Sequence, residues 1–84
     1  MSPANEHCWA VTCKNIVFHE QRNPFHGHRI PLARTDALAP LPALRGPIRV
    51  ACDECGKEYS YAPEEVMKVQ QDLPESFRPH VALR

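Results

Sequence analysis

The sequence IRVACDECGKEYSY, residues 48–61, decides how this chain of 84 residues folds. Cys52 and Cys55 are two residues apart, so the chain between them can turn tightly and point both sulfurs at one metal ion. Gly56 follows, where a residue without a Cβ accommodates the positive φ that closes such a turn. The flanking residues read as two short strands, 48–52 and 57–61. The stretch therefore predicts a β-hairpin whose turn supplies half of a tetrahedral zinc site.

The size and composition of the chain indicate why a metal would help it to fold. The chain has only three Phe, two Tyr and one Trp to fill a core, and its nine prolines restrict regular structure. A single domain of about this length buries only about 60% of the surface that its unfolded chain exposes. Such a domain usually needs a metal, disulfides or a partner to be stable.

The charge of the chain is balanced, with ten basic and ten acidic residues. The segment 22–49 holds five arginines and one acid, whereas seven acids and two lysines lie in 53–75. This asymmetry is too mild for a nucleic-acid-binding domain, which is typically basic. Because no signal peptide or membrane span is visible, we expect a cytoplasmic protein without a membrane partner. In a reducing compartment, spaced cysteines bind metals more often than they form disulfides.

The residues before the hairpin predict further short strands. Residues 7–13 alternate as a strand would, with Trp9 and Val11 on one face, and residues 16–19 suggest a second strand. The segment 31–47 is rich in Pro, Ala and Leu, which predicts a connector that lays its leucines over the core. A proline-rich docking ligand is the alternative, although no PxxP motif occurs.

After the hairpin, Pro63 favours the first turn of a short helix that we expect to end near Val69. Beyond Gln71, prolines and scattered charges predict a loose tail.

The residues WAVTCKN at 9–15 and the stretch 48–61, joined by a proline-rich middle, resemble small bacterial zinc-ribbon proteins. In that group, two Cys-x-x-Cys knuckles cap two hairpins and share one zinc ion. The resemblance implies a small, mostly β fold, namely a zinc ribbon of two short β-hairpins with a short C-terminal helical turn. We expect this domain to span 7–71, with 31–47 as its connector and flexible segments at 1–6 and 72–84.

The resemblance implies that Cys13, Cys52 and Cys55 are zinc ligands. It leaves the fourth ligand open, because Ile16 stands where the family has its second cysteine.

Two residues are the main candidates for the fourth ligand. Cys8 precedes Cys13 by a spacing that zinc pairs do use, although a straight strand would separate the two sulfurs by about 15 Å. His7 meets the same objection. His19 follows at Cys-x5-His and needs only a wider loop. The predicted ligands are therefore Cys8, Cys13, Cys52 and Cys55, with His19 as the alternative fourth ligand and a degenerate, metal-free site as the third interpretation.

Several of these residues have simpler interpretations. Cys8 fits equally well as a small buried hydrophobic residue. His26 and His28 could bind a second metal, but histidines in a loop are usually solvated. Tyr59 and Tyr61 could stack on a base, but alternate aromatic residues in a strand usually belong to the core.

A thiol-redox role for Cys52 and Cys55 is weakly supported. A redox Cys-x-x-Cys opens a helix that lowers the pKa of its first thiol, whereas a strand is predicted here. Asp53 and Glu54 between the thiols also disfavour thiolates.

The function expected from this sequence is a non-catalytic, structural zinc-binding module that mediates interaction with another protein. An ion enclosed by four protein ligands leaves no open position for water, and no catalytic triad or phosphate-binding loop is visible. Asp53, Glu54 and Glu58 make the knuckle tip acidic, which favours a protein partner over nucleic acid or a small-molecule substrate.

Two alternatives remain open. The first is a nucleic-acid-binding zinc ribbon acting in transcription or regulation through arginines such as Arg34, Arg45 and Arg49, which have few acidic neighbours in the sequence. The second and weaker is an enzyme, either a thiol-redox protein or a three-cysteine zinc site with Glu54 or His19 as its base.

Overall fold

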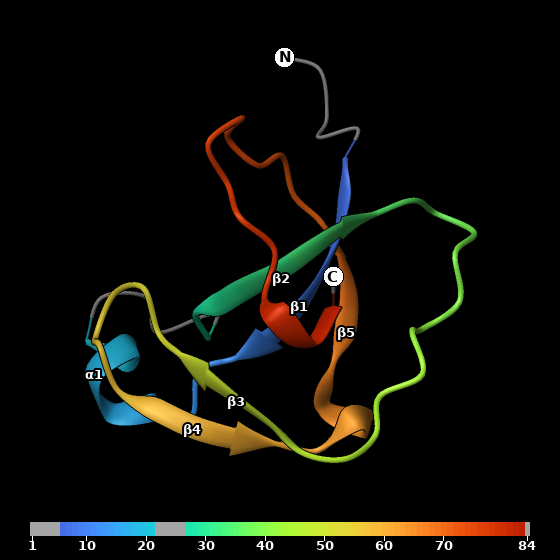
Figure 1. Ribbon diagram of the computed structural model, residues 1–84. Coiled ribbons are helices and arrows are strands. Elements are labelled where there is room, and N and C mark those ends of the chain that lie inside the picture. Colours follow the sequence, from blue (N-terminus) through green and yellow to red (C-terminus); the bar gives the residue numbers. More distant parts are fainter. Residues whose placement is uncertain (1–5, 22–26, 84) are drawn as a thin grey trace.

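The computed structural model describes residues 6–21 and 27–83. Two small antiparallel sheets cross each other (Figure 1). Along the chain, the elements are β1 (His7–Thr12), α1 (Ile16–Glu20), β2 (Arg29–Thr35), β3 (Ile48–Ala51), β4 (Glu58–Tyr61), the 3-10 turn η1 (Pro63–Glu65), β5 (Met67–Gln70) and the 3-10 turn η2 (Val81–Leu83). The expected small, mostly β fold is confirmed.

The first sheet has the order β2-β1-β5, with β1 in the centre. Trp9 pairs with Ala33 and Ala10 pairs with Pro31, so that Leu32 is one extra residue on β2 and forms a β-bulge. Because β1 is covered on both faces, its apolar residues run continuously instead of alternating with polar ones. Cys8 and Ala10 occupy one face, and Trp9 occupies the other.

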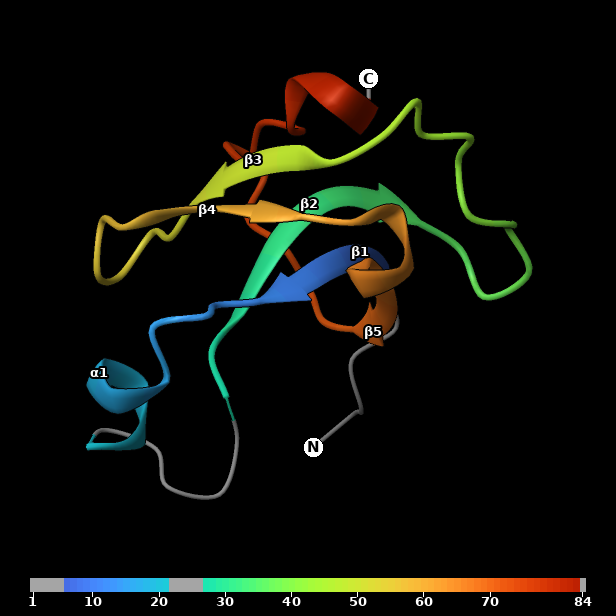
Figure 2. The same cartoon turned by 90° about the horizontal axis from the view of Figure 1, so that it is seen from below.

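The hairpin predicted around residues 48–61 is present as β3 and β4, which form the second sheet. Ile48 and Val50 face inward as expected, and Tyr61 is almost fully buried. The hairpin packs against β1 and β2 (Figure 2). The main core thus lies between the two sheets and comprises Trp9, Val11, Cys13, Ile30, Leu32, Ala33, Ile48, Val50, Cys52, Tyr61 and Val66.

The prediction of a second strand at residues 16–19 is wrong, because these residues form α1. Among residues 6–21 and 27–83, no strand pairs with them, and strand propensity depends on such a partner. A helical turn satisfies its own backbone groups, and the His19 N–H donates to the Asn15 carbonyl over 3.3 Å. The turn leaves Ile16 and Val17 61% and 70% exposed, while it buries His19.

The helix expected from Pro63 to Val69 is also shorter than predicted. It ends after one 3-10 turn, in which the Glu65 carboxylate accepts a hydrogen bond from the Ala62 N–H. The chain then forms β5, which pairs with β1 from Ala10–Met67 onward. This pairing buries Val69 against the face of β1 that carries Cys8.

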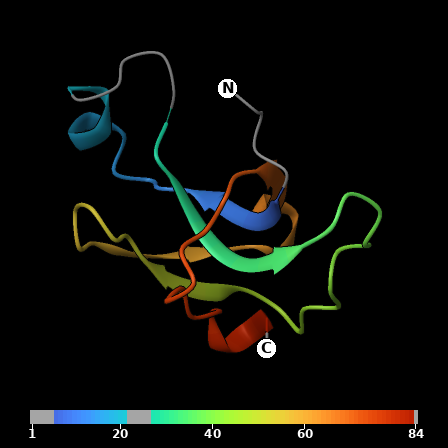
Figure 3. The same cartoon turned by 90° about the horizontal axis from the view of Figure 1, so that it is seen from above.

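The connector covers the core less than expected. Leu44 packs against the main core, but Leu38 is 93% exposed, and the segment arcs away from both sheets (Figure 3).

The segment from residue 72, for which the sequence predicts a loose tail, runs back to the sheets. The His80 N–H donates to the Leu32 carbonyl over 2.7 Å, and the His80 ring Nε2 lies 2.8 Å from the Arg49 carbonyl. Leu83 also packs against the main core. Within the described residues, no helix is long and apolar enough to cross a membrane.

Candidate metal centre

Four side chains from three parts of the chain meet at one end of the molecule. The ligand atoms of Cys13, His19, Cys52 and Cys55 all lie within 4.8 Å of one another. Cys13 follows β1, His19 lies on α1, and the two remaining cysteines lie in the β3–β4 turn. In Figure 1, α1 and this turn are found at the same end of the fold.

Backbone hydrogen bonds close the β3–β4 turn that carries Cys52 and Cys55. The Cys52 N–H donates to the Lys57 carbonyl over 2.9 Å, and the Gly56 N–H donates to the Cys52 carbonyl over 3.1 Å. The Glu54 N–H points at the Cys52 sulfur, 3.4 Å away. Gly56 has a φ of 75°, as the sequence predicted, and only glycine adopts this conformation without strain.

The other half of the cluster is held where β1 ends. The Cys13 N–H donates to the His28 carbonyl over 2.8 Å, which fixes the cysteine beside the returning chain. Gly27 permits this approach, because a Cβ at residue 27 would lie 2.8 Å from the Thr12 Cγ2. The helical turn of α1 then carries His19 back toward the sulfurs.

Two distances within the cluster fit a tetrahedral zinc site. With Zn–S bonds near 2.3 Å and Zn–N bonds near 2.0–2.1 Å, tetrahedral angles place two sulfurs about 3.8 Å apart and a sulfur and a nitrogen about 3.5 Å apart. The Cys13 and Cys55 sulfurs are 3.7 Å apart, and the Cys52 sulfur is 3.5 Å from the His19 Nε2. These distances identify Nε2 as the ligand atom that His19 offers.

Cys8, the fourth ligand named first from the sequence, is not part of this group. It is fully buried in a separate cluster with Ala10 and Val69, with Leu73 packed against it. Burial raises the pKa of its thiol, and the nearby Glu6 carboxylate raises it further. The strand geometry that argued against Cys8 thus holds in the structure, and His19, the alternative candidate, stands in its place.

The thiols of the cluster differ in how readily they ionise. Burial raises the pKa of Cys13 to about 12. Burial also opposes ionisation of Cys55, but the hydrogen bonds that its sulfur accepts, first from the Lys57 backbone N–H, lower its pKa to about 6. A dication between the sulfurs favours the thiolate forms and displaces the protons that remain.

His28 forms an outer contact of the cluster that sequence reasoning missed. Its Nε2 lies 2.6 Å from the Asp53 Oδ1, and its Nδ1 lies 3.0 Å from the Glu54 Oε2. Its ring stacks on His19 with the centroids 4.8 Å apart. The adjacent acids Asp53 and Glu54 at the knuckle tip are the feature of the sequence that could have indicated a basic partner such as His28. His26, the other histidine considered for a second metal, lies outside the described residues.

Two arginines of the middle segment, Arg34 and Arg49, have acidic partners in the fold. Arg49 donates to Glu58 on the neighbouring strand, and Arg34 lies 3.4 Å from the Glu6 carboxylate. These two arginines have few acidic neighbours along the sequence, but the fold brings an acid to each of them.

Three thiolates and one imidazole form a donor set that suits zinc. In tetrahedral geometry, these four ligands leave no coordination position open for water. Comparison with protein-family models, with curated protein sequences and with solved structures finds no match to this chain. The assignment of the cluster as a metal site therefore depends on its geometry.

Proposed function

We propose that this protein binds one zinc ion through Cys13, His19, Cys52 and Cys55, and that the ion has a structural role. The observation that carries this proposal is the agreement of two distances, 3.7 Å between sulfurs and 3.5 Å from sulfur to nitrogen, with tetrahedral zinc. Cysteine and histidine ligands also distinguish zinc from calcium and magnesium, which prefer oxygen.

The proposed ion joins three parts of the chain, namely the residue that follows β1, the helical turn α1 and the β3–β4 turn. The first two ligands are at 13 and 19, and the other two are in the turn that follows β3. Because α1 has only five residues, it cannot be stable by its own helical hydrogen bonds. Zinc would fix α1 against the knuckle and so complete one end of the core.

We further propose that the protein is a non-catalytic module that presents a rigid surface to another protein. Four protein ligands close the coordination sphere, so the ion has no position at which to activate water. The pairing of Arg34 and Arg49 with acids supports a protein partner over nucleic acid, since phosphate binding needs cationic groups that can neutralise phosphates.

Native mass spectrometry of the purified protein tests the zinc proposal, with the denatured protein as the reference mass. We expect one zinc per chain. Removal of zinc with a chelator should abolish the near-UV circular dichroism of Trp9, which is buried in the core that contains two of the ligands. Absence of bound metal, or a Trp9 signal that the chelator does not change, would show that the cluster is not a structural zinc site.

A further inference from the structure

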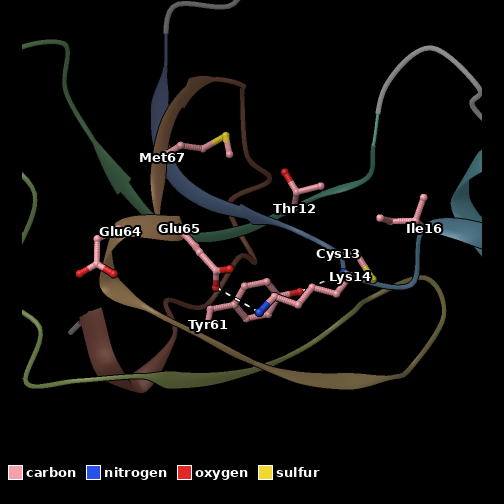
Figure 4. Close-up of a pocket in the computed structure, with 8 residues that line it drawn as sticks. All are labelled: Thr12, Cys13, Lys14, Ile16, Tyr61, Glu64, Glu65 and Met67. Atoms are coloured by element: carbon pink, nitrogen blue, oxygen red, sulfur yellow. Dashed lines mark hydrogen bonds and ion pairs between the residues drawn. The ribbon is translucent and has the colours of Figure 1, made fainter.

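A cavity of about 360 Å³ opens directly beside the metal cluster. Figure 4 shows its lining, in which Ile16, Tyr61 and Met67 provide apolar walls and Cys13 lies at one end. The walls come from α1, β4 and β5, which are distant in the sequence. An engineered cavity of about 150 Å³ already binds benzene, so this one has room for a large side chain and its adjoining backbone.

Two of the apolar residues that line the cavity are poorly covered by the protein itself. Ile16 is 61% exposed and Met67 is 37% exposed, whereas Tyr61 is buried. Single exposed apolar residues are common, but two that line the same hollow point to an interaction site. A partner that covered them would gain free energy from the burial of apolar area.

The charges at the rim of the cavity sum to a negative value. Lys14 is engaged, because its ammonium group lies 2.6 Å from the Ser60 carbonyl and 3.2 Å from the Glu65 carboxylate. It also lies over the Tyr61 ring, 4.6 Å from the centroid. Glu64 is exposed and pairs with no cation among residues 6–21 and 27–83. An incoming cation therefore finds a free carboxylate here.

We propose that this cavity binds a segment of a partner protein in which a large apolar side chain lies next to a lysine or arginine. The apolar side chain fills the hollow between Ile16 and Met67, and the basic side chain pairs with Glu64. This inference rests on the proposed function, because α1 carries both the wall residue Ile16 and the metal ligand His19. A nucleic acid fits less well, since its phosphates would meet the same carboxylate.

A random heptapeptide library displayed on phage, selected against the zinc-loaded protein, tests this proposal. We expect enriched peptides in which an aromatic or large aliphatic residue lies within two positions of Lys or Arg. The affinity of a synthetic enriched peptide should fall about tenfold or more with Ile16→Asp, as for a typical interface anchor. It should fall about two- to fivefold with Glu64→Lys, as expected for an exposed ion pair.

Leu38→Asp is the matched control, because Leu38 is a 93% exposed apolar residue in the connector and does not line the cavity. It should change the affinity of the same peptide by less than about twofold. Met67→Glu serves as a second test should Ile16→Asp fail to fold.

The proposal is overturned if no peptide is enriched, if enriched peptides lack a basic residue, or if they bind Ile16→Asp and Met67→Glu as tightly as the unchanged protein. The zinc content of every variant is measured first. An unchanged protein that carries no zinc contradicts the proposed function, whereas a zinc-loaded protein that binds no such peptide contradicts only the docking proposal.

Discussion

Replacement of His19 by alanine should separate the two candidates for the fourth zinc ligand. His19 is 3% exposed, and its Nε2 lies 3.5 Å from the Cys52 sulfur. His19→Ala removes this nitrogen and leaves three cysteines around the ion. Cys8→Ala is the control, because Cys8 is equally buried but lies outside the cluster. We expect the first change to weaken zinc binding strongly and the second to leave it intact.

The size of the effect follows from the number of ligands. Structural zinc sites in small domains bind with about 10–16 kcal/mol of apparent free energy at pH 7. If four ligands share this evenly, one ligand contributes about 2.5–4 kcal/mol, which corresponds to a factor of about 100 to 1,000 in the zinc Kd. Cys8→Ala leaves only a small void in the second core cluster, so it should lower the free energy of unfolding by about 1 kcal/mol.

Competition with a fluorescent zinc indicator at pH 7 measures the two zinc affinities directly. Urea unfolding of the zinc-loaded proteins provides the stability control. The reasoning would be refuted if His19→Ala kept its zinc affinity within about tenfold of the unchanged protein, or if Cys8→Ala lost the metal. The latter result would return Cys8 to the ligand set.

Two further results are expected. Because the pKa of Cys13 is raised to about 12, its thiol keeps its proton at all ordinary pH values, and zinc must displace that proton. Zinc affinity should therefore rise at least about tenfold per pH unit between pH 6 and 8. Competition titrations that show no dependence of zinc affinity on pH would contradict this ionisation order. The substitution His28→Phe keeps a ring against His19 but loses the contacts with Asp53 and Glu54. The zinc affinity of this variant should fall about 10- to 100-fold. The control substitution His7→Phe, on β1, should change the zinc affinity little.

The β3–β4 hairpin could be predicted from the sequence because short-range features of the chain specify it. The Cys-x-x-Cys spacing, Gly56 and the alternation of residues 48–61 act over a few residues, and each was found as predicted. The burial of Ile48, Val50 and Tyr61 followed in the same way, because a strand with one covered face fixes which side chains point inward.

Long-range contacts decided the elements that the sequence mispredicted. Residues 16–19 have strand-forming side chains, but no strand in the described part of the chain pairs with them, and they form α1 instead. Residues 67–69 were expected to be helical, yet they belong to β5, which pairs with the free edge of β1. In both segments the presence or absence of a partner strand outweighed the local preference, which is worth only a few tenths of a kcal/mol per residue.

The sequence by itself determined three of the four residues of the candidate site, namely Cys13, Cys52 and Cys55, and it narrowed the fourth mainly to Cys8 or His19. Only the tertiary structure chose between these two. β1 is a strand that places Cys8 on the face opposite the main core, while the helical turn of α1 carries His19 onto the sulfurs. Spacing along a chain limits which side chains can meet, but the conformation of the intervening residues decides which of them do.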